Sequence, residues 1–201
     1  MAVKFFAFRS GADNDLVFDS EGNLYVTDFH DRPLNYEGGI YRFDAADDYK
    51  TCKKIAGEMM TPNGIGFSPD EKYMWAAETV PNTLVRFILT PEREPKPMFL
   101  GTKRVCHING CDMCDSLKVD AEGNVYIAMM YGGRLVVTNE DGTIIENVLI
   151  EERTEEGCMA SPNLALHPTK PEGYILACGL GGSWIYKFEA LAPACKMYSR
   201  S

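Results

Sequence analysis

Residues 61–79 read TPNGIGFSPDEKYMWAAET, and the fold prediction starts from this stretch. Asn63 and Gly64 stand directly before an alternating apolar run. A polar turn at 68–72 separates that run from a second, more apolar one. Two short apolar runs joined by a polar turn predict an antiparallel β-hairpin. The stretch alone leaves open whether the amide of Asn63 serves the local backbone or a bound ligand.

The same arrangement recurs three more times along the chain. NDLVFDSEGNLYVTDF begins at Asn14, DSLKVDAEGNVYIAMM begins at Asp115, and NLALHPTKPEGYILACG begins at Asn163. The last apolar residue of each first run follows the previous one after 49, 52 and 47 residues; these are Phe18, Phe67, Val119 and Leu166. A third apolar segment and a weaker fourth one complete each unit. Four short strands repeated at this period predict the blades of an all-β fold, a β-propeller.

The number of units bears on how complete the ring is. A β-sandwich also contains many short strands, but it does not require the same turn chemistry in every hairpin. Units starting near 14, 63, 115 and 163 fill residues 1–201 as one domain. Four-bladed rings are rare, so we expect about four blades of a larger ring, with the first blades missing or supplied by another subunit. An outer strand for the first unit is expected at 3–8.

Composition and charge narrow the class of partner. The chain has 201 residues, of which 45% are hydrophobic and 24% charged, as in ordinary globular proteins. Its net charge of −9 argues against nucleic acid or an anionic membrane as the main partner. No apolar run approaches the roughly 20 residues that cross a bilayer. The first residues show no cleavable signal pattern, so a cytoplasmic location is expected.

The seven cysteines are scattered and odd in number, which favours reduced thiols over a disulfide framework. The stretch CHINGCDMCD brings Cys106, His107, Cys111 and Cys114 close together in sequence. A structural zinc site usually takes a second ligand pair beyond a longer loop, and that pair is absent here. Free cysteines are therefore predicted, with zinc as the alternative.

A propeller gathers its innermost strands around a central channel, so one repeat position becomes one ring of side chains. Four residues before the aligned apolar position stand Asn14, Asn63, Asp115 and Pro162, followed by Asp15, Gly64, Ser116 and Asn163. Converging oxygen donors suit Ca²⁺, which takes six to eight oxygens at about 2.3–2.6 Å. Asn and Asp also cap backbone at strand ends, but three polar residues in register favour a metal site.

With these motifs the chain resembles the senescence marker protein, gluconolactonase and luciferin-regenerating enzyme family of six-bladed calcium propellers. Within that family it is most similar to the drug-responsive lactonases. The segments that carry the resemblance are NDLVFDSEGNLYVTDF, PNGIGFSPDEKYMWAAET with NTLVRF, and DSLKVDAEGNVYIAMMYGGRLVV. The similarity runs from about Gly11 to Phe188.

The resemblance implies roles for the ring residues. Asn63 and Asp115 match calcium ligands, and Ser116 matches a further ligand of the drug-responsive branch. Asn14 matches a channel residue that contacts metal or substrate, and Asp15 stands beside it. Asp115 also matches the carboxylate that acts as proton donor or base in lactone hydrolysis, where calcium polarises the carbonyl group.

One departure from the family concerns the calcium shell. A glutamate from the first blade completes that shell in the family, whereas no glutamate precedes Asn14 in this chain. We therefore expect a missing N-terminal part that completes the ring, or a chain that binds calcium weakly and is not an enzyme by itself.

The leading functional prediction is hydrolysis of a small-molecule lactone. A nucleophilic serine is disfavoured because the chain has no G-x-S-x-G, and His30, His107 and His167 fall outside the ring position. The alternative is a non-catalytic propeller fragment that acts as a binding or assembly module. Such a module could self-associate through exposed strand edges.

Overall fold

The computed structural model describes residues 12–30, 36–97, 99, 101–154, 160–179 and 181–196. In these ranges nearly all regular structure is β-strand. Two short 3-10 helices are also present, η1 (Ala45–Asp47) and η2 (Glu151–Thr154). No helix in the described ranges is long and apolar enough to span a membrane. The outer strand expected at 3–8 lies outside the described residues.

The described strands form four antiparallel sheets, each built from consecutive strands. Blade 1 contains β1 (Asp13–Phe18), β2 (Leu24–Asp28), β3 (Gly38–Phe43) and β4 (Cys52–Met59). Blade 2 contains β5 (Pro62–Phe67), β6 (Tyr73–Glu78), β7 (Thr83–Ile88) and β8 (Lys103–His107). Blade 3 contains β9 (Cys114–Val119), β10 (Val125–Met129), β11 (Arg134–Thr138) and β12 (Ile144–Leu149). Blade 4 contains β13 (Ala160–Leu166), β14 (Glu172–Gly179) and β15 (Gly182–Glu189).

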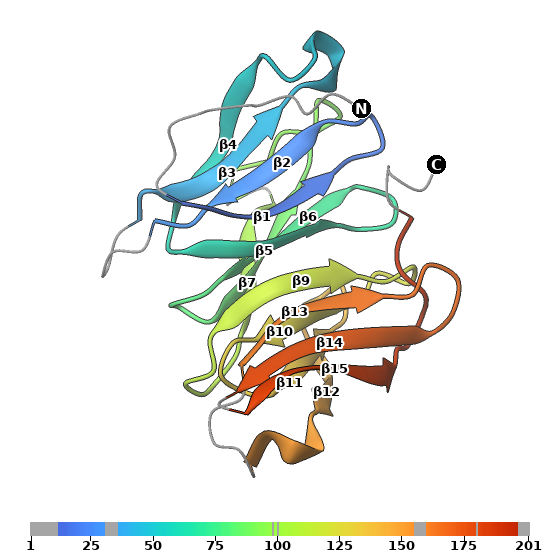
Figure 1. Cartoon of the computed structure of the whole chain (residues 1–201). Coiled ribbons are helices and arrows are strands. Elements are labelled where there is room, and N and C mark those ends of the chain that lie inside the picture. Colours follow the sequence, from blue (N-terminus) through green and yellow to red (C-terminus); the bar gives the residue numbers. More distant parts are fainter. Residues whose placement is uncertain are drawn as a thin grey trace.

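The blades follow one another in chain order, as Figure 1 shows. The first strand of each blade packs against the first strand of the next, so that β1, β5, β9 and β13 line the inner side. Two face-packed sheets, as a sandwich requires, are not the arrangement of the described strands. The predicted all-β propeller, with about four of its blades in this chain, is confirmed.

Three apolar cores fill the spaces between neighbouring blades. The strand β6 shows how one sequence serves two of them, because successive side chains of a strand point to opposite faces. Met74 and Ala76 pack in the core between blades 1 and 2, whereas Trp75 and Ala77 pack in the core between blades 2 and 3. This burial on both faces explains why MWAA is a continuous apolar run rather than an alternating one.

The turn between the first two strands is built in the same way in blades 1 and 3. The buried Asp120 carboxylate accepts hydrogen bonds from the backbone of Glu122 and Asn124, from the Asn124 amide and from the Tyr126 hydroxyl, at 2.9–3.1 Å. Asp19 makes the equivalent four contacts in blade 1. The matching turn of blade 4 uses the Nδ1 atom of His167 as acceptor. His167 is therefore a turn residue and lies outside the ring position, as the alignment indicated.

Within the described residues, one face of blade 4 is covered by no other blade. Its inward face belongs to the core shared with blade 3, while Tyr174, Leu176 and Ile185 lie on the opposite face. Leu176 and Ile185 are cross-strand partners, and the Ile185 side chain is 73% exposed. The result is an apolar strip along this blade of the described structure.

Segment 190–196 leaves blade 4 and crosses to blade 3. The backbone N–H of Leu191 donates to the Tyr126 hydroxyl at 2.8 Å, and that of Cys195 donates to the Val119 carbonyl at 3.0 Å. A bridge also pairs Ala194 with Asp120. These contacts fasten the segment beneath the ends of the inner strands.

Candidate functional site

Each innermost strand carries a β-bulge near its start. In blade 2 the pairs Pro62–Glu78 and Ile65–Ala76 flank it, so three steps on β5 oppose two on β6. The same shift occurs in every blade, and the bulged residues are Asn14–Asp15, Asn63–Gly64, Asp115–Ser116 and Ser161–Pro162. Bulges re-aim side chains and are frequent beside functional sites. In blades 1, 2 and 3 the repeat position predicted to form the site is thus a backbone irregularity.

The fourth bulge differs from the sequence alignment by one residue. The alignment placed Pro162 and Asn163 at the ring position, whereas the bulge falls at Ser161 and Pro162. The turn of this unit is nevertheless aligned correctly at His167. β13 therefore has one more residue between bulge and turn than β1, β5 and β9. Asn163 is exposed as a consequence, and the buried Ser161 hydroxyl donates to the Met129 carbonyl at 2.7 Å.

The second and third bulges lie against each other because of Gly64. A Cβ atom placed on this residue would meet the Leu117 nitrogen at 2.4 Å and the Asp115 carbonyl oxygen at 2.6 Å. Both are backbone atoms of β9, so no side-chain rotation could relieve the contact. The absence of a side chain at Gly64 lets β5 approach β9 closely enough to bring Asn63 next to Asp115.

The Asn63 side chain is buried and only partly satisfied. Its Nδ2 donates to the Thr79 hydroxyl at 3.3 Å, while its Oδ1 has no hydrogen-bond partner in the described structure. The residue is 4% exposed. A buried amide oxygen without a partner is costly, because folding has removed its water without replacing the hydrogen bond. An amide oxygen of this kind is suited to serve as a ligand for a hard cation.

The Asp115 carboxyl lies beside it and is half-buried. Burial raises the pKa of Asp115 above its ordinary value, and the negative charge of Asp15 raises it further. Interactions with the Asn63 side chain and with the backbone N–H of Ser116 act in the opposite direction. Asp115, Asn63 and Asp15 are therefore within electrostatic reach of one another. The Ser116 residue itself is buried.

Thr27 ties the first bulge to the second. Its hydroxyl donates to the Asn63 carbonyl at 2.8 Å and accepts the backbone N–H of Asp15 at 3.0 Å. One carboxylate oxygen of Asp15, Oδ2, is buried without a hydrogen bond. The Nζ atom of Lys118 lies 3.7 Å from that oxygen. Asn14, at the same bulge, is exposed to solvent.

These donors fit a hard cation. Two carboxylates, one orphaned amide oxygen and a hydroxyl-bearing residue offer the oxygen atoms that Ca²⁺ prefers, with no imidazole or thiolate among them.

No group of three or more His, Cys, Asp or Glu side chains suited to a metal occurs in the described ranges. The zinc alternative at Cys106, His107, Cys111 and Cys114 thus gains no support from the described residues. Burial raises the pKa of the Cys114 thiol to about 12.

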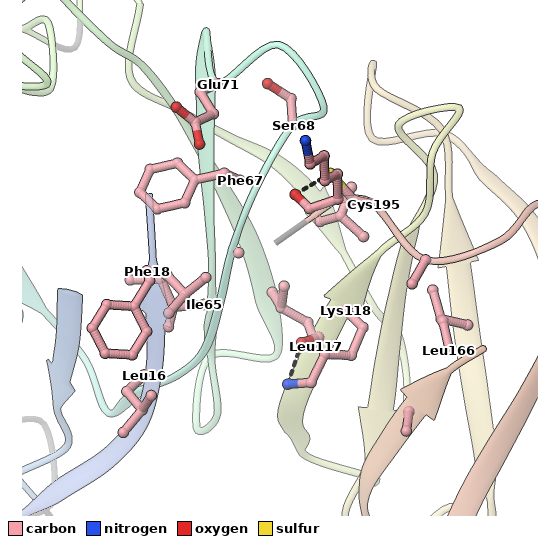
Figure 2. Close-up of a pocket in the computed structure, with 16 residues that line it drawn as sticks. Leu16, Phe18, Ile65, Phe67, Ser68, Glu71, Leu117, Lys118, Leu166 and Cys195 are labelled. Atoms are coloured by element: carbon pink, nitrogen blue, oxygen red, sulfur yellow. Dashed lines mark hydrogen bonds between the residues drawn. The ribbon is translucent and has the colours of Figure 1, made fainter. Parts of the chain in front are cut away.

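A cavity of about 130 Å³ lies along the inner strands beyond the bulges (Figure 2). Its wall is mainly apolar and comes from all four blades, with Leu16, Phe67, Leu117 and Leu166 among the lining residues. Segment 194–196 also lines it. The polar bulges and this apolar cavity therefore occupy successive stretches of the same inner strands.

Two residues that position the site were not predicted from the sequence. Thr27 faces the first bulge, and the residues facing the other three are Ala77, Ala128 and Ala177. All four are fully buried. The signal available in the sequence was a small residue at the matching position in the second strand of each blade. Lys118 had no such signal, because no other unit carries a lysine at its position.

Comparison with known proteins points to one family. The sequence profile of the SMP-30/Gluconolactonase/LRE-like region matches residues 8–164. Lactonase drp35 of Staphylococcus saprophyticus is 32% identical over 188 residues, which cover 92% of this chain and 57% of that protein. Lactonase drp35 of Staphylococcus aureus strain MRSA252 is 33% identical with the same coverage. The chain thus spans less than two thirds of the length of these relatives.

Solved structures show the same fold at lower identity. Regucalcin from Agrobacterium tumefaciens, described as a calcium-binding protein, superposes with a TM-score of 0.69 at 19% identity, covering 92% of this chain and 65% of that one. A gluconolactonase from Xanthomonas campestris gives a TM-score of 0.67 at 18% identity, covering 92% and 60%. The profile match and the lactonase relatives together place this chain in the SMP-30/gluconolactonase/LRE-like family.

Proposed function

We propose that this chain carries part of the active site of a calcium-dependent hydrolase of small lactones. The observation that supports this best is the buried, unpartnered Oδ1 of Asn63 beside the half-buried Asp115 carboxyl. The names of the lactonase and gluconolactonase relatives favour the same reaction class. The chain covers 57% of the length of the lactonase from Staphylococcus saprophyticus, so the assignment of lactonase activity to the whole protein is also a proposal.

In this proposal Asn63, Asp115 and Ser116 hold the calcium ion, with Asn14 and Asp15 close to ion and substrate. A bound calcium ion supplies Lewis acidity, which stabilises negative charge on a carbonyl oxygen. Asp115 moves a proton at its carboxyl oxygens, to or from water or the leaving alkoxide. Burial raises the pKa of Asp115, which is the direction expected for a carboxyl group that takes up a proton during a reaction.

The experiment is a hydrolysis assay on simple aliphatic and aromatic lactones with calcium or with a chelator. We expect turnover that requires calcium and falls at least about a hundredfold in Asp115→Asn, the scale of a lost general acid or base. Asp141→Asn is the matched control, because Asp141 is 84% exposed and lies on the rim of blade 3. Equal turnover in chelator, or an active Asp115→Asn variant, would refute the proposal.

The non-catalytic module gives a different result in the same assay. Such a protein would show no turnover at any calcium concentration, but would bind another chain tightly. The exposed apolar strip of blade 4 is the feature that favours this second candidate. Gel filtration of the same sample, with and without calcium, distinguishes the two outcomes.

A further inference from the structure

Lys118 connects two blades that are not neighbours. It lies on β9 of blade 3, two residues after the bulge, and its side chain is 30% exposed. Its Nζ atom lies 3.7 Å from Oδ2 of Asp15 on β1 of blade 1. Figure 2 shows the lysine nitrogen between β1 and β9, held by a hydrogen bond to the Leu117 carbonyl at 2.9 Å. The side chain therefore places a positive charge beside the cavity that the inner strands line.

The contact between Lys118 and Asp15 is electrostatic rather than a hydrogen bond. At 3.7 Å the two atoms attract each other, yet Oδ2 of Asp15 has no hydrogen-bond partner. The ammonium keeps its hydrogen bond on the Leu117 carbonyl instead. A lysine has three N–H donors on a flexible side chain, so the hydrogen bond of Lys118 to the Leu117 carbonyl does not depend on the Asp15 carboxylate.

The charge count of the candidate metal site depends on this lysine. Asp15 and Asp115 contribute two negative charges, and Lys118 cancels one of them at close range. Calcium affinity follows the charge of the ligand set. A divalent cation and an ammonium group that face the same carboxylate also repel each other.

We propose that Lys118 is a tethered cation that neutralises Asp15 in the metal-free protein and competes there with the divalent ion. The inference rests on the proposed metal site at Asn63 and Asp115. Binding of the ion displaces the ammonium from Asp15, and the Leu117 carbonyl together with the neighbouring cavity gives it a place to remain. Lys118 is a positioning residue and takes no part in bond breaking.

The test is calorimetric titration of the metal-free protein with calcium, without lactone. Lys118→Met keeps the length of the side chain and removes its charge, and we expect calcium to bind about three- to tenfold more tightly. Lys118→Arg keeps the charge and should bind as the natural protein does. Lys187→Met is the matched control, because Lys187 pairs with Glu172 on the outer part of blade 4 and its loss changes the net charge equally.

A second measurement needs no metal. Thermal melts of Lys118→Met, Asp15→Asn and the double variant in chelator should show coupling, with the lysine substitution harmless once Asp15 is neutral. Calcium binding that is equal in Lys118→Met and the natural protein would overturn the role of Lys118 and leave the lactonase proposal standing. If neither the natural protein nor any variant binds calcium, the proposed role of Lys118 and the proposed calcium site both fail.

Discussion

At the scale of single residues, Gly64 and Asn63 divide the construction of the site between them. Gly64 has no side chain where β5 meets the backbone of β9, and the close approach follows from that absence. Asn63 then occupies the contact with an amide oxygen that has no partner. Gly64 sets the distance between blades 2 and 3, and Asn63 supplies an unsatisfied hydrogen-bond acceptor at that contact.

Substitution of Gly64 by alanine should separate the two strands. The new Cβ atom would lie 2.4–2.6 Å from backbone atoms of β9, so the free energy of unfolding should fall by about 1–3 kcal/mol. Gly57→Ala is the control, since its Cβ would meet only the flexible Lys54 side chain at 3.3 Å and should be neutral or slightly stabilising. Urea denaturation of both variants measures the difference. Equal stability of the two would show that β5 and β9 separate freely.

Substitution of Asp115 by asparagine should preserve or raise the stability of the metal-free protein and remove its stabilisation by calcium. A raised pKa means that burial penalises the charged carboxylate, and this penalty grows as the pH rises above the ordinary pKa of an aspartate. At pH 7 without metal, Asp115→Asn should therefore be as stable as the natural chain or more stable. Added calcium should no longer raise its melting temperature. A destabilised metal-free variant would assign Asp115 a structural role instead.

At the scale of elements, the Asp-centred turns of blades 1 and 3 define where the second strand of each of these blades begins. The carboxylate of Asp120 gathers four donors, and Tyr126 among them also binds segment 190–196. A single buried side chain therefore holds a hairpin and, through the tyrosine, a distant segment of chain. Loss of such a group leaves several buried donors without acceptors.

Replacement of Asp120 by alanine should accordingly be severe. We expect a loss of about 2–4 kcal/mol in the free energy of unfolding, because charged hydrogen bonds are removed and their donors stay buried. Asp141→Ala, at an exposed position, should change it by less than about 0.5 kcal/mol. Chemical denaturation followed by tryptophan fluorescence compares the two. Similar effects in both variants would contradict this account of the turn.

The same elements show how far sequence patterns carry. The repeated turns are visible in sequence because Asp, Gly and Asn have specific backbone roles, and these turns located all four blades. The bulges are less visible, because no residue type is required at them: Asn14, Asn63, Asp115 and Ser161 begin the four. In blade 4 the extra residue of β13 moved the bulge by one position without any change in the turn. The contact of Lys118 with Asp15 could not be predicted, since it depends on the spacing of non-neighbouring blades.

At the scale of the whole molecule, the described blades form a series, and blade 4 at one end of it has an exposed apolar face. Inner blades bury both sides, whereas blade 4 presents Leu176 and Ile185 to solvent. Exposed apolar strips of this kind favour contact with another surface. The described structure is thus well packed between its blades and exposes apolar side chains on one face of blade 4.

Introduction of a charge on this strip should reduce association. Ile185→Glu should lower the binding of an apolar dye and shift the protein toward monomer at high concentration, because a glutamate resists burial. Ile145→Glu on β12 is the control, since that residue is 46% exposed at the outer edge of blade 3. Light scattering across a concentration series compares them. An unchanged mass for Ile185→Glu would exclude the strip as the contact surface.

The response of the chain to calcium should be modest. Two carboxylates offset by one lysine provide a weakly charged ligand set, and calcium affinity follows that charge. At a calcium concentration near the dissociation constant the stabilisation is only about 0.4 kcal/mol. Thermal melts with and without millimolar calcium should therefore differ by a few degrees at most. A large shift would mean that this chain already contains a complete, tight calcium shell.

The fastening of segment 190–196 onto blade 3 also imposes an order on biosynthesis. Leu191 follows its partner Tyr126 by 65 residues, so the ribosome adds this contact about 3–13 s after the tyrosine at ordinary elongation rates. At the end of that interval the strands of blade 3 have been synthesised but segment 190–196 has not, so the Tyr126 hydroxyl and the Val119 carbonyl lack their hydrogen bonds to that segment. A nascent chain stalled before Leu191 should thus be cut by protease within blade 3 while blades 1 and 2 resist.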